Sequence, residues 1–185
     1  MQQIDDLLHR TSPCMIGGLV RTFARLAGRM SFQTVQQSIR IAADPRQVWD
    51  ALTDPDAGEK WRNAHFKTDW QPGSAIEIEA IIGTERYRDK GQVVQSEPPS
   101  LLRYTYWSRV SGLPDAPESY SSITMALEAE GAETVLTVTQ QVPPSPVRRG
   151  KGWEIGEDSG WHHIAFYWRV TLPILKRAVE ELHRD

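Results

Sequence analysis

The hydrophobic pattern of the chain changes its period once, and this change limits the fold more than any other feature. From Trp161 to Leu182, apolar residues recur at intervals of three and four, as on one face of a helix. Before that, apolar and polar residues alternate in six short segments, at 64–70, 74–81, 86–96, 101–107, 120–129 and 134–142. The connections between these segments are too short for the crossover helices that parallel strands need. The sequence therefore predicts an antiparallel meander of strands followed by one long amphipathic helix.

A further strand and two short helices are predicted ahead of the meander. Residues 34–42 alternate with Val35, Ile39 and Ile41 on one face. Two Asp-Pro pairs follow, at 44–45 and 54–55, and each supplies an N-cap oxygen and a proline suited to the first helical position. The second helix is expected to end near Trp61. Because helices this short are unstable alone, we expect Trp49 and Trp61 to fix them onto a larger element.

Residues 1–33 differ in character from the rest of the chain and are treated as a separate segment from the domain at 34–185. Between Ile16 and Ala27, apolar residues recur at helical spacing with Arg21, Arg25 and Arg29 on the other side. A basic amphipathic helix can dock on the domain, and it can also touch an anionic membrane surface as a leader. A third interpretation is that Met30 is the true initiator, because the residues after it resemble the opening of a first strand.

Composition excludes several classes of protein. The 185 residues are enough for one domain with a core of its own. The net charge of -3 argues against a nucleic-acid partner. There is no run of about 18 apolar residues, so we expect no transmembrane segment. The single Cys14 forms no internal disulfide, which favours a cytoplasmic location.

Four blocks of sequence resemble the START/Bet v1-like (SRPBCC) superfamily, and more narrowly its branch related to the C-terminal domain of the Hsp90 ATPase activator Aha1. They are "VWDALTDPDAGEKW", "DWQPGSAIEIE", "KGQVVQSEPPSLLRYTYW" and "GWHHIAFYWRVTLPILKRAVEEL". The resemblance covers about residues 35–183. It implies an α+β helix-grip fold, in which a curved antiparallel sheet of about seven strands surrounds the C-terminal helix and a hydrophobic pocket. Family members include lipid and hormone carriers, and polyketide cyclases and aromatases. The branch has no universal catalytic motif, so no active site is carried over.

Alternation along the strands places a mostly apolar set of side chains on the inner face of the sheet, where a small-molecule site is expected. Tyr104 and Tyr106 can donate hydrogen bonds to a ligand carbonyl or phenol, and the flexible Met125 can adapt to a ligand's shape. The alternative is that these side chains only fill the space between sheet and helix. The candidate ligand-binding residues are Phe66, Ile78, Tyr104, Tyr106, Met125, Trp161, Ala165 and Trp168.

Other chemistry has weaker support in the sequence. His162 and His163 are adjacent and point about 100° apart on a helix, so they do not chelate one ion, and we predict neither a metal nor a cofactor. One of these histidines can still reach the cavity mouth as an acid or base. The glycine-rich stretch 148–161 is expected to form a mobile hinge, where Arg148, Arg149 and Lys151 can attract an anion. The long loop 108–120 is a second candidate lid.

Three functions remain open at this point. The first is a carrier or sensor domain that holds a hydrophobic or aromatic small molecule in an internal cavity. The second is an enzyme of the cyclase or aromatase kind, with Tyr104, Tyr106 and His162 as candidate acids or bases. The third is an interaction module with a chaperone of the Hsp90 type as partner. Whether any reaction is catalysed is left undecided by the sequence.

Overall fold

A computed structural model describes residues 31–82 and 84–182 of the chain. The predicted helix or leader at 1–33 therefore lies outside the described residues, except for its last three positions.

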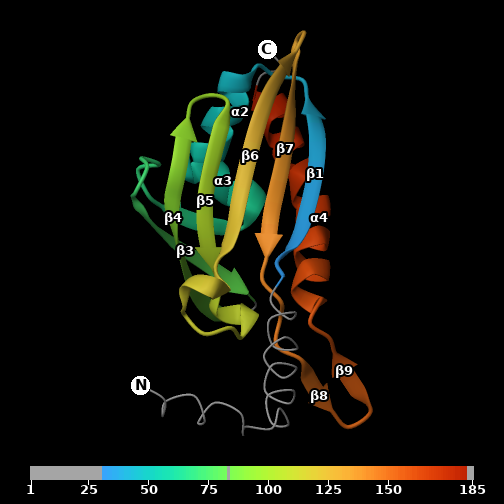
Figure 1. Ribbon diagram of the computed structural model, residues 1–185. Coiled ribbons are helices and arrows are strands. Elements are labelled where there is room, and N and C mark those ends of the chain that lie inside the picture. The colour runs from blue at the N-terminus through green and yellow to red at the C-terminus, as the bar shows by residue number, and fades with distance from the viewer. Residues whose placement is uncertain (1–30, 83, 183–185) are drawn as a thin grey trace, which may run out of the picture. The chain divides into compact units, whose positions relative to one another are not determined.

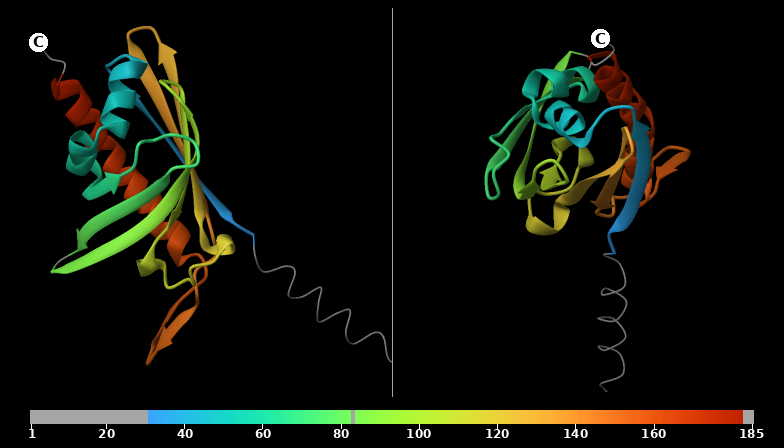
Figure 2. Two further views of the ribbon diagram at one scale, coloured as in Figure 1. Left: turned by 90° about the vertical axis from the view of Figure 1, so that its left-hand side faces the viewer. Right: turned by 90° about the horizontal axis from the view of Figure 1, so that it is seen from above.

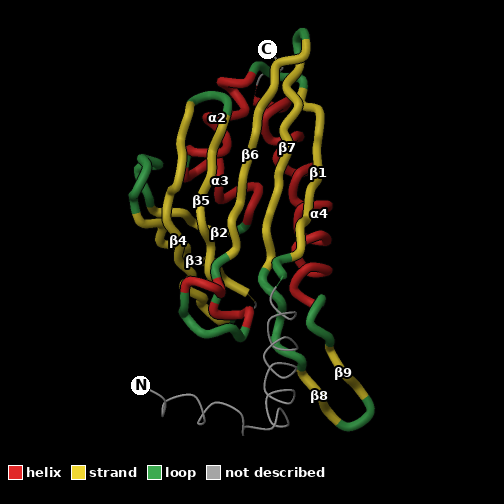
Figure 3. The backbone as a smooth tube through the Cα atoms, in the orientation of Figure 1, coloured by secondary structure: helices red, strands yellow, loops and turns green. Residues whose placement is uncertain are grey.

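The domain is built on a seven-stranded antiparallel sheet, as predicted (Figure 1). Its strands run in the order β1-β7-β6-β5-β4-β3-β2, so that β1 closes onto the last long strand and every other neighbour follows in the chain. A tube drawing shows the meander of consecutive hairpins (Figure 3). The bounds are β1 (Gln33–Ile41), β2 (Ala64–Lys67), β3 (Ala75–Ile82), β4 (Glu85–Glu97), β5 (Leu101–Trp107), β6 (Ser121–Glu130) and β7 (Glu133–Val142).

Two short helices, α2 (Pro45–Thr53) and α3 (Pro55–Arg62), follow β1. The Asp44 side chain accepts the backbone N–H groups of Arg46 and Gln47, and the Gln47 side chain bonds back to the Asp44 N–H, which completes a capping box. The Asp54 side chain caps α3 by accepting the backbone N–H of Ala57, at 2.7 Å. Both N-caps predicted from the Asp-Pro pairs are confirmed.

The C-terminal end of α2 is capped by three side chains from later in the chain. Helices end with carbonyl groups that lack partners inside the helix. Here the carbonyl of Ala51 accepts from Trp61 Nε1 at 3.0 Å, that of Leu52 from the Arg62 guanidinium at 2.6 Å, and that of Thr53 from Trp70 Nε1 at 2.8 Å. Trp61 and Trp70 thus hold the corner between the two helices as hydrogen-bond donors as well as by packing.

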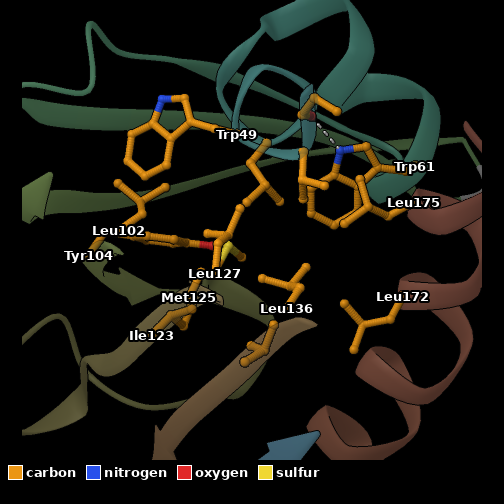
Figure 4. Close-up of a cluster of buried hydrophobic side chains, with 14 of the residues drawn as sticks. Trp49, Trp61, Leu102, Tyr104, Ile123, Met125, Leu127, Leu136, Leu172 and Leu175 are labelled. Atoms are coloured by element: carbon orange, nitrogen blue, oxygen red, sulfur yellow. Dashed lines mark hydrogen bonds between the residues drawn. The ribbon is translucent and has the colours of Figure 1, made fainter. Parts of the chain in front are cut away.

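The long helix α4 (Ser159–Leu182) lies on the same face of the sheet as α2 and α3 (Figure 2). Pro173 lies inside the helix. Leu172 of α4 points toward Leu136 of the sheet, and Leu175 lies beside Trp61 (Figure 4). No helix within the described residues is long and apolar enough to cross a membrane. The arrangement confirms the α+β helix-grip fold. The buried residues of α4 are Trp168, Thr171, Leu172, Leu175 and Val179.

The predicted inner face of the sheet agrees with the observed burial. Ile76, Leu136 and Val138 are no more than 1% exposed. The turn before β3 has a proline and a glycine at the positions that a type II turn favours, with Gly73 at a φ of 90° and the Ser74 N–H donating to the Gln71 carbonyl at 3.0 Å.

One element departs from the prediction. The stretch expected to be a hinge contains a two-stranded hairpin, β8 (Arg148–Gly150) and β9 (Trp153–Ile155). Its two-residue turn ends in Gly152, whose φ of 81° suits glycine.

Candidate functional site

One end of the space between the sheet and the helices is filled by a buried arginine and aromatic rings. The Arg62 guanidinium is 4.2 Å from the ring centre of Phe66 and 4.7 Å from that of Trp61. Tyr104 meets Phe66 and Trp70 edge-on, with ring centres 6.3 and 5.9 Å away. We call Arg62, Trp61, Phe66, Trp70 and Tyr104 the arginine–aromatic cluster. Burial lowers the pKa of the Arg62 guanidinium from its usual value.

A pocket of about 310 Å³ lies at the other end of this space. It is next to the C-terminal ends of β5 and β7, the N-terminal end of β6 and the start of α4. The loop 108–120 forms one wall, with short 3₁₀ turns η1 (Arg109–Ser111) and η2 (Pro117–Ser119). The first turns of α4 and the β8–β9 hairpin contribute another. The apolar lining residues are Val110, Leu113, Val142, Pro143, Ile155 and Ile164. The polar ones are Tyr106, Arg148, His163 and the serines 108, 111, 119, 121, 145 and 159.

Tyr106 on β5 is the pocket residue with the best-defined chemistry. Its hydroxyl donates to Asp89 Oδ2 at 2.7 Å, and Asp89 Oδ1 accepts the backbone N–H of Arg109 at 2.9 Å. Asp89 is 9% exposed, and it faces inward from β4. Burial, and after it the charge of Asp89, raises the pKa of the Tyr106 phenol above its usual value. Because its one proton is directed at Asp89, the Tyr106 hydroxyl forms any further hydrogen bond as an acceptor, and the Ser108 hydroxyl is a neighbouring donor.

The candidate residues named from the sequence are divided between this pocket and the packed interior. Tyr106 lines the pocket. Phe66 and Tyr104 belong to the arginine–aromatic cluster. The others lie elsewhere in the interior or along the seam between α4 and β1. Ile78 and Met125 are core residues at 3% and 2% exposure, and Trp168 donates to Gln140 Oε1 at 2.8 Å. Trp161 Nε1 donates to the Thr34 carbonyl, and the Ala165 carbonyl accepts from Gln37.

Most of the pocket lining comes from segments that carry no periodicity. Four of the six serines lie in loop segments and Arg148 lies on the short hairpin, where hydrophobic alternation gives no information, whereas Ser121 begins β6 and Ser159 begins α4. The usable signals were the alternation that points to Tyr106, the cationic Arg148, the adjacent histidines and the length of the loop at 108–120, which does form a wall. Of the adjacent histidines, His163 lines the pocket, whereas His162 pairs with Asp158 at 3.1 Å. Among the described residues, no group of three or more His, Cys, Asp or Glu gathers in a way that could hold a metal ion.

Comparisons with known proteins place this geometry in context. The solution structure of ChR145 from Cytophaga hutchinsonii is 25% identical, with a TM-score of 0.64, and covers 82% of this chain and 97% of its own. The solution structure of the Aha1 dimer from Colwellia psychrerythraea is 21% identical, with a TM-score of 0.59, over 80% of this chain and 96% of its own. DynU16, a protein in the dynemicin biosynthetic locus, is 20% identical with a TM-score of 0.60, and the match covers 80% of this chain and 47% of DynU16.

Sequence comparison identifies the family. No curated protein matches the sequence significantly. The family model described as "Activator of Hsp90 ATPase homolog 1-like protein" matches residues 42–179, which span α2, α3, the strands β2 to β9 and most of α4. The chain belongs to the Activator of Hsp90 ATPase homolog 1-like protein family.

Proposed function

We propose that this protein binds a small apolar or aromatic molecule in the pocket beside Tyr106, as a carrier or sensor domain does. The observation that supports the proposal is the pocket itself, which has apolar walls and a few polar groups at fixed places, the usual make-up of a small-molecule site. At about 30 Å³ for each water-sized group, 310 Å³ accommodates about ten non-hydrogen atoms. The ligand is therefore of the size of an alkylphenol or a medium-length aliphatic chain.

The test compares two tryptophan substitutions on the same helix. Ile164 is half-buried and lines the pocket, whereas Val170 is 41% exposed and lies away from it. Calorimetric titration with 1-octanol and 4-propylphenol should show saturable binding to the parent protein. Ile164→Trp fills the pocket and should weaken this binding by about tenfold or more, which is about 1.4 kcal/mol. Val170→Trp should leave it unchanged. Absence of binding, or equal binding by the two variants, would refute the proposal.

A cyclase- or aromatase-like reaction is the second candidate. It is favoured by the Asp89–Tyr106 hydrogen bond in the pocket wall, which gives a buried carboxylate a connection to a bound molecule. The fold likeness to DynU16, a protein in a biosynthetic locus, also favours an enzymatic function. Such an enzyme should exchange the α-protons of an acetophenone probe with deuterium oxide, as followed by NMR. Exchange that Asp89→Asn does not reduce, or no exchange at all, would count against this function.

A chaperone partner is the third candidate, and it rests on family membership. The outer face of α4 carries Phe166, Val170 and Ile174 at four-residue spacing, exposed by 53%, 41% and 39%. Contiguous exposed apolar side chains are typical of protein-docking surfaces. If this face contacts an Hsp90-type chaperone, purified protein should stimulate the chaperone's ATPase, and Phe166→Ser should reduce the stimulation. An unchanged ATPase rate with the parent protein would exclude this role.

A further inference from the structure

The first turn of α4 forms part of the pocket wall. Ser159, Gly160 and His163 line the pocket from the N-terminal end of this 24-residue helix. The N-terminal end of a helix carries a partial positive charge, which favours a nearby anion. Gly160 donates its N–H to Ser145 Oγ at 2.9 Å, which holds this end of the helix against the segment after β7. A helix end alone does not define a site, so the neighbouring side chains decide what it binds.

The charged side chains of the pocket have one sign. Arg148 is a permanent cation, and the lining contains no aspartate or glutamate among the described residues. Arg148 donates to the Ser111 carbonyl at 3.3 Å, which uses one of its five N–H groups. Within the described part of the chain, no carboxylate lies within ion-pairing distance of it.

The acidic groups near the pocket have other partners. Glu154 pairs with Arg149 at 2.6 Å, and Asp158 pairs with His162. Asp89 is occupied by Tyr106 and by the Arg109 N–H. None of them therefore serves as the counter-ion of Arg148.

Two serines provide the independent observation that points to a ligand. Ser119 and Ser121 are 5% and 7% exposed, and both line the pocket. Among the described residues, neither hydroxyl has a hydrogen-bond partner. Buried polar side chains normally have one, so a hydroxyl that faces the pocket without a partner is suited to a polar ligand atom. Together with Arg148 and the start of α4, these hydroxyls supply donors to one end of a bound molecule.

We infer that the pocket selects small apolar acids, with the anionic group held by Arg148, the serine hydroxyls and the start of α4. The apolar body of the acid packs against Val142 and Ile164. This inference rests on the proposed small-molecule function and names the class of ligand. The acid is a carboxylate of about ten non-hydrogen atoms, as the pocket volume requires.

The experiment uses three probes with the same eight-carbon chain: octanoate, 1-octanol and octylammonium. Calorimetric titration should give the tightest binding for octanoate and the weakest for octylammonium, with about tenfold between octanoate and octanol, or about 1.4 kcal/mol. Raising the salt concentration should narrow this gap, because Arg148 is exposed to solvent and its charge is screened. Octanol binding should not change with salt.

Two arginines of the hairpin provide matched variants. Arg148→Gln removes the charge at the pocket and should reduce octanoate affinity about tenfold while octanol affinity stays the same. Arg149→Gln removes a neighbouring charge that is paired with Glu154, and should change neither affinity. Ser121→Ala, which removes a hydroxyl without altering charge, should weaken octanoate more than octanol.

These measurements distinguish a failure of the acid selectivity from a failure of small-molecule binding. If octanol binds the pocket as well as octanoate does, or if Arg148→Gln and Arg149→Gln have equal effects, the acid selectivity is wrong while small-molecule binding stands. If neither probe binds, or if Ile164→Trp affects neither probe, small-molecule binding in this pocket fails as well.

Discussion

Arg62 gives the sharpest test of how the arginine–aromatic cluster is stabilised. Its guanidinium is a buried cation held by ring faces and carbonyl oxygens, and no carboxylate among the described residues pairs with it. Two substitutions of Arg62 separate the contribution of its charge and hydrogen bonds from the contribution of its volume. Arg62→Met keeps an unbranched side chain in the arginine–aromatic cluster but removes the charge and the donor to Leu52. Arg62→Ala removes the volume as well.

The expected magnitudes follow from these contacts. Leaving the Leu52 carbonyl without its donor costs about 1–3 kcal/mol, and losing the desolvated cation–π contacts costs about 2 kcal/mol. Removing the buried charge recovers a desolvation penalty of several kcal/mol, so Arg62→Met should change stability by less than about 2 kcal/mol. Arg62→Ala leaves a cavity of about 100 Å³, which at about 24 cal/mol per Å³ adds about 2.4 kcal/mol of destabilisation.

The assay is urea unfolding of the two variants beside Arg103→Ala, an exposed arginine on β5 whose loss should cost about 0.5 kcal/mol or less. Thermal unfolding should place Arg62→Ala about 5–10 °C below Arg62→Met, because about 1 kcal/mol shifts the Tm of a domain this size by about 2–4 °C. If Arg62→Ala is as mild as Arg103→Ala, or if Arg62→Met is the more damaging of the two, this account of the cluster is refuted.

Three further predictions concern single side chains. Trp61→Phe leaves the Ala51 carbonyl without its donor and should lower the free energy of unfolding in urea by about 1–3 kcal/mol. Trp107→Phe removes an indole that bonds the exposed Pro114 carbonyl and should lower it clearly less. Equal losses would contradict the capping role of Trp61. Gly91→Ala should destabilise the protein strongly, because a Cβ there meets the Thr105 backbone carbonyl, and a wild-type Tm would contradict this. Burial raises the pKa of the phenols of Tyr104 and Tyr106. The phenol of a tyrosine in an unfolded chain has a pKa of about 10. The stability that these phenols contribute is therefore complete below about pH 10 and is lost as the pH rises further. Alkaline unfolding should be shallower for Tyr104→Phe, and an unchanged profile would argue against a buried neutral phenol.

Much of the fold could be predicted because its signals are local. The alternation through Ile76 and Ile78 identified a buried face, and the Asp44-Pro45 and Asp54-Pro55 pairs identified two helix starts. The capping of α2 could not be predicted in this way. It joins Ala51, Leu52 and Thr53 to side chains 10 to 17 residues later, and nothing in a local pattern specifies which carbonyl a tryptophan reaches.

The candidate site was harder to predict for a related reason. Alternation shows that Tyr104 and Tyr106 face the same side of the sheet, but it does not show where packing leaves space. Tyr104 lies against rings gathered around Arg62, whereas Tyr106, two residues along β5, faces the pocket. Arg62 was not a candidate, because a charged residue at the end of a short helix is ordinarily solvated. Ser119 lies in the loop before β6, where no periodicity exists, and Ser121 lies in an alternating segment, but alternation does not show that its hydroxyl faces a pocket.

Methyl chemical-shift mapping tests the central claim most directly, that a small apolar molecule is held at the Tyr106 end of the interior and not at the Arg62 end. The protein carries isoleucine, leucine and valine methyl groups at both ends, and 1-octanol is titrated into a labelled sample. The account predicts saturable shifts at Val110, Leu113, Val142 and Ile164. It predicts little change at Ile78 and Leu102, which lie in the packed core. Shifts concentrated at Ile78 and Leu102, or no saturable shifts at the pocket methyl groups, would contradict it.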